Sequence, residues 1–64
     1  MIQAESLSEQ KKLAQGDEYV EFNDTWLNKS RFIQKVSSGK FILYTYSEDR
    51  FMSQGLRESL EEAM

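Results

Sequence analysis

The chain has 64 residues, of which 39% are hydrophobic and 30% are charged, and its 11 acidic and 8 basic side chains give a net charge of −3. This composition is too hydrophobic for a disordered tail and too polar for a membrane span. Cysteine and histidine are absent, which excludes disulfides, thiol nucleophiles, imidazole bases and zinc or haem sites built on these residues. We expect residues 1–64 to form a single small domain without cofactor or metal.

The first predicted element is a helix. Ser6-Leu7-Ser8-Glu9 matches a capping box, in which the serine side chain and the glutamate three residues later satisfy open backbone amides. The helix should begin near Leu7 and end at Gly16, a residue type that tolerates the backbone geometry beyond a helix end. Before it, Met1–Glu5 lacks the basic and apolar segments of a signal peptide, so we expect a cytoplasmic protein that makes no membrane contact.

Between residues 19 and 46 the composition shifts to aromatic and β-branched residues, which favour strands. Turn-forming residues at Asn28–Ser30 and Ser37–Gly39 divide this region into three strands of an antiparallel meander. A three-residue loop at Asn28–Ser30 would pair Trp26 with Phe32, and a two-residue Ser38-Gly39 turn would pair Val36 with Phe41.

The final predicted element is a helix over residues 47–64, capped by Ser47 and started by Glu48 and Asp49, which suit the positive end of the helix dipole. The fold class is therefore α+β in the order α-β-β-β-α, with this helix packed on one face of the sheet. The predicted core comprises Val20, Phe22, Trp26, Phe32, Val36, Phe41, Leu43, Met52, Leu56 and Leu60.

The opposite sheet face carries the candidate binding surface. The predicted register places Lys35 beside Ile42, Ile33 beside Tyr44 and Arg31 beside Tyr46 on that face. Tyrosine and arginine are enriched at the centres of protein interfaces, whereas lysine belongs at their rims. The predicted partner-binding residues are Arg31, Ile33, Lys35, Ile42, Tyr44 and Tyr46.

Three roles are open for this face. It could be covered by the first helix, it could contact another protein or a second copy of the chain, or its cations and rings could bind single-stranded nucleic acid. Residues 26–47 contain four basic and no acidic side chains, which favours nucleic acid, whereas the net charge of −3 argues against it. Contact with a protein or a second copy is our first expectation, and nucleic acid is the alternative.

Catalytic chemistry has little support in the sequence. Glycine occurs only at positions 16, 39 and 55, which cannot form a phosphate-cradling loop. The carboxylates show no pattern that would hold a pair in a cleft, and the serines have no imidazole to activate them. The sequence therefore predicts a non-enzymatic regulator, acting as a homodimer or by inhibitor-like binding, and a small chain of this composition suits a phage or mobile-element protein.

Overall fold

The computed structural model describes all residues from 1 to 64 and contains a six-stranded mixed sheet with two short helices. Strands hold 44% of the chain and helices 17%. The elements are β1 (Ile2–Gln3), α1 (Leu7–Leu13), β2 (Val20–Phe22), β3 (Thr25–Leu27), β4 (Arg31–Lys35), β5 (Phe41–Ser47), β6 (Arg50–Arg57) and α2 (Leu60–Ala63). The predicted three-stranded meander with a C-terminal helix on one face is wrong.

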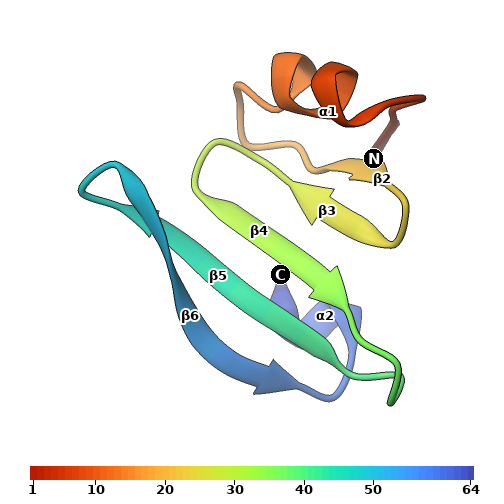
Figure 1. Cartoon of the computed structure of the whole chain (residues 1–64), viewed down its shortest axis with the longest axis vertical. Helices are drawn as coiled ribbons and strands as arrows, with labels where there is room; N and C mark the ends of the chain where they lie inside the picture. The colour runs from red at the N-terminus through yellow and green to blue at the C-terminus, as the bar shows by residue number, and fades with distance from the viewer.

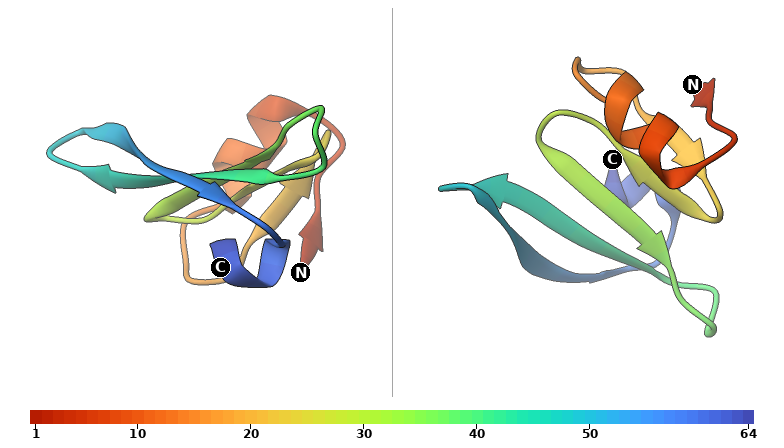
Figure 2. Two further views of the ribbon diagram at one scale, coloured as in Figure 1. Left: turned by 90° about the horizontal axis from the view of Figure 1, so that it is seen from below. Right: turned by 45° about the horizontal axis from the view of Figure 1, so that its top comes forward.

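The strands lie side by side in chain order, from β1 to β6 (Figure 1). β1 pairs with β2 in parallel across the crossover that contains α1, and every later pair is antiparallel. The two helices lie on opposite sides of the sheet (Figure 2). We call these sides the α1 face and the α2 face. No helix in the structure combines the length and the apolar character needed to cross a membrane.

Helix α1 begins where its capping residues predict. The Ser6 hydroxyl accepts a hydrogen bond from the Glu9 backbone N–H at 3.1 Å, and the Glu9 carboxylate accepts one from the Glu5 N–H at 2.9 Å. The helix ends at Leu13 with Ala14 as its C-cap, a turn earlier than the glycine signal predicts. It covers β2 and β3 on the α1 face, and it leaves the larger part of that face without a helix (Figure 1).

The predicted helix over residues 47–64 is replaced by strand β6 and the four-residue α2. Glu48 and Asp49 adopt positive φ angles of 53° and 65°. Two consecutive residues of this kind form the tight hairpin turn whose twist matches that of paired strands. The chain therefore folds back, and Tyr46 pairs with Phe51 at a ring-centroid distance of 5.1 Å. Only Ser59 then caps a helix, with its hydroxyl accepting from the Glu62 N–H.

A second hairpin turn interrupts what the sequence pattern presents as one strand before Asn28. Asn23 and Asp24 have φ angles of 51° and 59°, and they join β2 to β3 with Phe22 opposite Thr25. Val20 then pairs with Leu27, so it lies on the α1 face while Trp26 lies on the α2 face. The prediction that Val20 and Trp26 share one face is wrong.

The registers on both sides of β4 differ by one residue from those predicted. Trp26 pairs with Ile33 rather than with Phe32. Lys35 rather than Val36 pairs with Phe41, because the turn has three residues and ends on Gly39 at a φ of 85°. A slip of one residue sends every side chain of a strand to the other face. The two errors cancel between β3 and β5, so among these three strands only β4 has its side chains on the faces opposite to those predicted.

The core lies on the α2 face and is small. Trp26, Ile33, Leu43 and Ala63 form one buried cluster, against which Tyr19, Phe41 and Leu60 pack. The structure buries three of the ten predicted core residues, Val20, Trp26 and Leu43, and it places Phe22, Phe32, Val36, Phe41 and Leu60 at intermediate exposure. Met52 and Leu56 are exposed at 46% and 54%, because β6 is an edge strand instead of a buried helix.

Candidate functional site

The structure divides the six predicted binding residues between the two faces. The β4 residues Arg31, Ile33 and Lys35 lie on the α2 face, and the β5 residues Ile42, Tyr44 and Tyr46 lie on the α1 face. Side chains alternate along a strand, and the register pairs Ile33 with Leu43 rather than with Tyr44. The surface predicted from sequence, with basic and aromatic side chains on one face, is therefore wrong.

The three β4 residues have separate environments. Ile33 is completely buried in the core cluster, so it presents no binding surface. Arg31 donates from its guanidinium to the backbone carbonyl of Met64, which ties β4 to the end of α2. Lys35 is exposed and takes part in none of the three ion pairs of the chain. This group supports the core and its border rather than a common site.

Two of the three β5 residues, Tyr44 and Tyr46, belong to a strip of aromatic side chains on the α1 face. We define the aromatic strip as Phe32, Tyr44, Tyr46 and Phe51. Its rings lie 5.8 Å apart for Phe32 and Tyr44, 6.2 Å for Phe32 and Phe51, and 5.1 Å for Tyr46 and Phe51. These are contact distances between neighbouring rings. The strip is continuous from β4 through β5 to the edge strand β6, beside the exposed Leu56.

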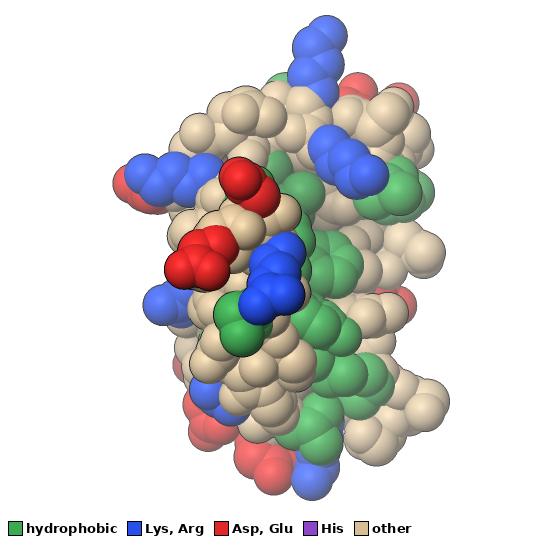
Figure 3. Space-filling view, turned by 60° about the vertical axis from the view of Figure 1, so that its left-hand side comes forward, with side chains coloured by type: hydrophobic (Ala, Val, Ile, Leu, Met, Phe, Trp, Pro, Cys, Tyr) green, Lys and Arg blue, Asp and Glu red, His purple; other side chains and the backbone are tan.

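A groove of about 620 Å³ separates the aromatic strip from helix α1. Helix α1 forms one wall of the groove, and the sheet forms its floor and the opposite wall. The lining residues are Leu7, Gln10, Lys11, Ala14, Gln15, Leu27, Asn28, Lys29, Phe32, Tyr46 and Phe51. The volume lies within the range of ligand-binding pockets. Figure 3 shows hydrophobic side chains gathered in a strip along the molecule, with charged side chains of both signs near its border.

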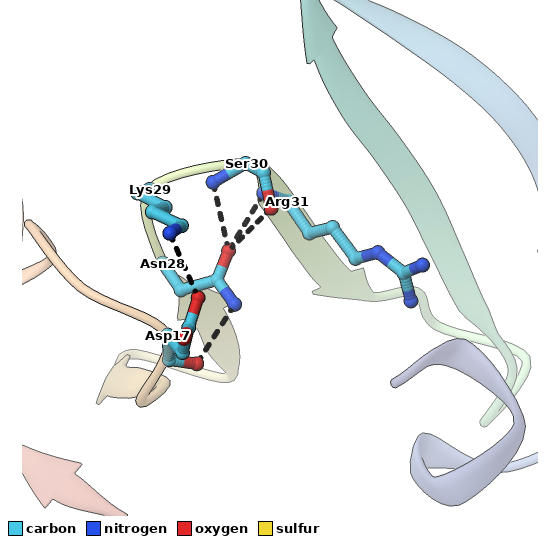
Figure 4. A network of polar contacts seen from close by, with 5 residues as sticks. All are labelled: Asp17, Asn28, Lys29, Ser30 and Arg31. Atoms are coloured by element: carbon cyan, nitrogen blue, oxygen red, sulfur yellow. Dashed lines mark hydrogen bonds and ion pairs between the residues drawn. The ribbon is translucent and has the colours of Figure 1, made fainter.

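The β3–β4 turn fixes one end of the groove through Asn28. Its side-chain oxygen accepts hydrogen bonds from the N–H groups of Ser30 and Arg31 at 2.9 and 2.8 Å, and its amide donates to the Asp17 carbonyl at 3.0 Å (Figure 4). Asn28 is 8% exposed, so these bonds replace lost contacts with water. The turn holds Lys29 at the mouth of the groove, where its ammonium pairs with Asp17 at 3.0 Å.

The charged groups around the groove are unequal in sign. Lys11 and Lys29 are the charged side chains of its lining, and none of the lining residues is acidic. Asp49, in the β5–β6 turn, accepts a hydrogen bond from the Tyr46 hydroxyl at 3.3 Å. Two cations are too few to gather a chain of phosphate groups, but two lysines beside apolar walls suit an occupant that is apolar and carries carboxylates.

Sequence reasoning missed four residues of this surface: Leu7, Lys11, Phe32 and Phe51. Phe32 was assigned to the core through the wrong register, and Phe51 to a helix that does not form. Leu7 was visible as the first apolar residue of α1, and it is 51% exposed where it lines the groove. The signal for Phe51 was its spacing from Tyr46, because two turn residues between flanking pairs place these rings opposite each other.

The structure gathers no group of three or more Asp or Glu side chains that could hold a metal ion. Every buried side-chain polar atom has a hydrogen-bond partner. Comparison with protein-family models, with curated protein sequences and with solved structures finds no match to this chain. Any function must therefore be argued from the surface itself.

Proposed function

We propose that this chain is a non-enzymatic binding protein that acts by occupying a surface of another protein with the aromatic strip on its α1 face. The observation that carries the proposal is the exposure of this strip in a folded chain: Tyr46 is 41% exposed and Phe51 is 44% exposed. Farther along the same face, Leu56 is 54% exposed where β6 pairs with Ile42. Single exposed hydrophobic residues are ordinary, but a contiguous patch is typical of an interaction surface.

The composition of the patch supports a protein partner. Aromatic residues are enriched at the centres of protein interfaces, where a few of them account for most of the binding energy. The rings of the aromatic strip pack on one another at 5.1–6.2 Å, whereas a single-strand platform offers separate rings to successive bases. The β4 cations predicted beside these rings lie on the other face. Nucleic acid is therefore the weaker alternative.

Edge strand β6 offers a matched pair of variants to test the proposal. Phe51 and Met52 are neighbours with nearly equal exposure, 44% and 46%, but they point to opposite faces of the sheet. Phe51→Glu therefore places a charge in the aromatic strip, and Met52→Glu places the same charge outside it. Neither side chain is buried, but Phe51→Glu also removes the ring contact with Tyr46 across the hairpin. Circular dichroism and urea unfolding therefore accompany the binding assay, and both variants should keep the wild-type spectrum.

The assay is selection of a displayed random-peptide library on the immobilised wild-type chain. Enriched peptides should bind wild type and Met52→Glu equally and should lose at least tenfold in affinity for Phe51→Glu. If the enriched peptides bind all three proteins alike, or if no peptide is enriched above the empty support, the proposal is wrong. Salt-sensitive binding of an oligonucleotide that needs Phe51 would instead support the nucleic-acid alternative.

A further inference from the structure

The unoccupied part of the α1 face has the width of one helix. Neighbouring strands are about 4.8 Å apart, so the three strands β4, β5 and β6 span about 10 Å. A helix with its side chains is about 10–12 Å across. α1 packs on β2 and reaches β3 through the Gln10–Thr25 hydrogen bond, and the groove lies beside it over β4 and the β5–β6 hairpin. One further helix laid beside α1 would complete a layer on this face of the sheet.

The walls of this groove specify the chemistry of the occupant. Leu7 and Ala14 line it from α1, and Leu27 and Phe32 line it from the sheet. The occupant must therefore present an apolar side of its own. An amphipathic helix in an apolar groove is a recurring mode of peptide recognition, and its anchors recur at every third or fourth residue.

The two lysines of the groove specify the charge on the flank of the bound helix. Lys11 takes part in no ion pair of the chain, and Lys29 pairs only with Asp17, whose side chain is 91% exposed. A pair so exposed to water contributes little to stability. A carboxylate on the occupant can therefore approach Lys11 directly and replace Asp17 beside Lys29, and no acidic lining residue opposes it.

We infer that the groove binds an amphipathic α-helix of a partner protein, with its apolar side on Phe32 and Phe51 and an acidic flank facing Lys11 and Lys29. This inference rests on the proposed function and specifies the partner. The contacts of the aromatic strip supply affinity. The two lysines select acidic over basic helices and fix the orientation of the bound helix.

A second copy of the chain fits the groove poorly. α2 has only four residues and is packed against the opposite face, so it cannot supply the missing helix. α1 has only seven residues, and it already places Gln10 against its own sheet and Leu7 in its own groove. Its remaining exposed side offers one large apolar residue, Leu13, beside the polar Ser8 and Lys12. We therefore assign the occupant to another protein.

Two designed peptides test the inference. Both carry the same stripe of Leu and Phe at helical spacing and the same capped ends, and the flanking positions are all Glu in one and all Lys in the other. Isothermal titration calorimetry at low ionic strength should show that the Glu peptide binds the wild-type chain about tenfold more tightly than the Lys peptide, because each weakly screened ion pair changes affinity by up to about fivefold. The difference should shrink in 0.5 M salt.

Adjacent lysines provide the matched control. Lys11 lines the groove and Lys12 does not, although both are exposed residues of the last turn of α1. Lys11→Glu should weaken the Glu peptide about tenfold and should reverse the preference toward the Lys peptide. Lys12→Glu, with the same net charge, should leave the affinities within about twofold of wild type.

Each other outcome overturns the inference in a different way. If library peptides bind through Phe51 but neither designed helix binds, the surface binds proteins and the helical acidic occupant is wrong. If both designed peptides bind equally, or if the two lysine variants behave alike, the charge selection is wrong. If sedimentation equilibrium shows a dimer that Phe51→Glu dissociates, the occupant is a second copy. If only an oligonucleotide binds, the proposed function fails together with the inference.

Discussion

Replacing Gln10 by glutamate should make the stability of this protein depend steeply on pH. The Gln10 side chain is completely buried between α1 and the sheet. Its amide nitrogen donates to the Val20 carbonyl at 2.8 Å and to the Thr25 hydroxyl at 3.2 Å. An ionised carboxylate has no proton to donate, so in the Gln10→Glu variant it would face the Val20 carbonyl oxygen as a second acceptor, in a site closed to water.

The magnitude follows from burial and from the size of the domain. Leaving a buried charge uncompensated costs about 3–5 kcal/mol, and a core of this size supplies only roughly 3–5 kcal/mol of net stability. The variant should therefore be largely unfolded at pH 7. The neutral Gln10→Met variant removes the hydrogen bonds without adding charge, and it should lose about 1–3 kcal/mol at every pH.

The sign of the pH effect is set by the protonated carboxyl, which can donate to Val20 as the amide does. Burial raises the pKa of the introduced carboxyl above its unfolded value of about 4.3. The stability of the variant is therefore highest below pH 4.3 and is lost as the pH rises through the raised folded-state pKa. Each variant is compared with wild type at the same pH, so that the titration of native carboxylates cancels.

Urea unfolding between pH 3.5 and 7.5, followed by circular dichroism, measures this difference. Gln34→Glu is the control, because Gln34 is exposed on β4 and its substitution makes the same charge change in water. Its stability should follow that of wild type within about 0.5 kcal/mol. A Gln10→Glu variant as stable as wild type at pH 7, or with a pH profile parallel to it, would refute the burial of Gln10 under α1.

Further substitutions test three features by urea unfolding: the β4 register, the β3–β4 turn, and a bulge in β6, where the pairing with β5 shifts register between Ile42 and Tyr44. Ile33→Ala should cost about 2–5 kcal/mol and Ile33→Val about 0.5–1.5 kcal/mol, because Ile33 is completely buried, and a cost near zero would restore the predicted register. Asn28→Ala should cost about 2 kcal/mol, since the Ser30 and Arg31 N–H groups lose the acceptor that the buried Asn28 side chain supplies, and a neutral result would mean that water replaces it. Gly55→Ala should cost about 1–3 kcal/mol through its φ of 92°, with no clash, and an unchanged midpoint would show that the β6 bulge relaxes.

The parts of the fold that sequence predicts correctly are those set by residues close together in the chain. The start of α1 depends on Ser6 and Glu9, which are three residues apart and satisfy the helix amides by themselves. The strand character of residues 31–35 and 41–46 follows from their aromatic and β-branched composition, whereas Ser47, predicted to cap a helix, ends β5 instead. No distant contact is needed for either prediction.

The two hairpin turns have no such local signal and were not predicted from the sequence. Asn23-Asp24 and Glu48-Asp49 both adopt the positive φ angles that glycine adopts most easily, yet neither pair contains glycine. Glu48-Asp49 after Ser47 has equally good helix-start chemistry. The structure resolves this competition through contacts across the hairpin, because Tyr46 and Phe51 pack ring on ring only if the chain reverses. Such pairs add a few tenths to one kcal/mol, enough to favour one of two balanced local choices.

The position of β4 decides what kind of surface the α1 face becomes. In the predicted register, Arg31 and Lys35 would stand beside Tyr44 and Tyr46, and the face would combine cations with rings as nucleic-acid platforms do. The observed turn lengths rotate β4 instead, so that Ile33 enters the core and Phe32 joins the aromatic strip.

The cations nearest the aromatic strip then come from α1 and from the β3–β4 turn, as Lys11 and Lys29 at the border of an apolar groove. Cations at the border of apolar walls, instead of among the rings, favour a folded apolar occupant with acidic edges over a phosphate chain. A shift of one residue in the pairing on each side of β4 thus takes Arg31 and Lys35 off the α1 face and brings Phe32 onto it. The face then has the character of a protein-binding surface instead of a nucleic-acid platform.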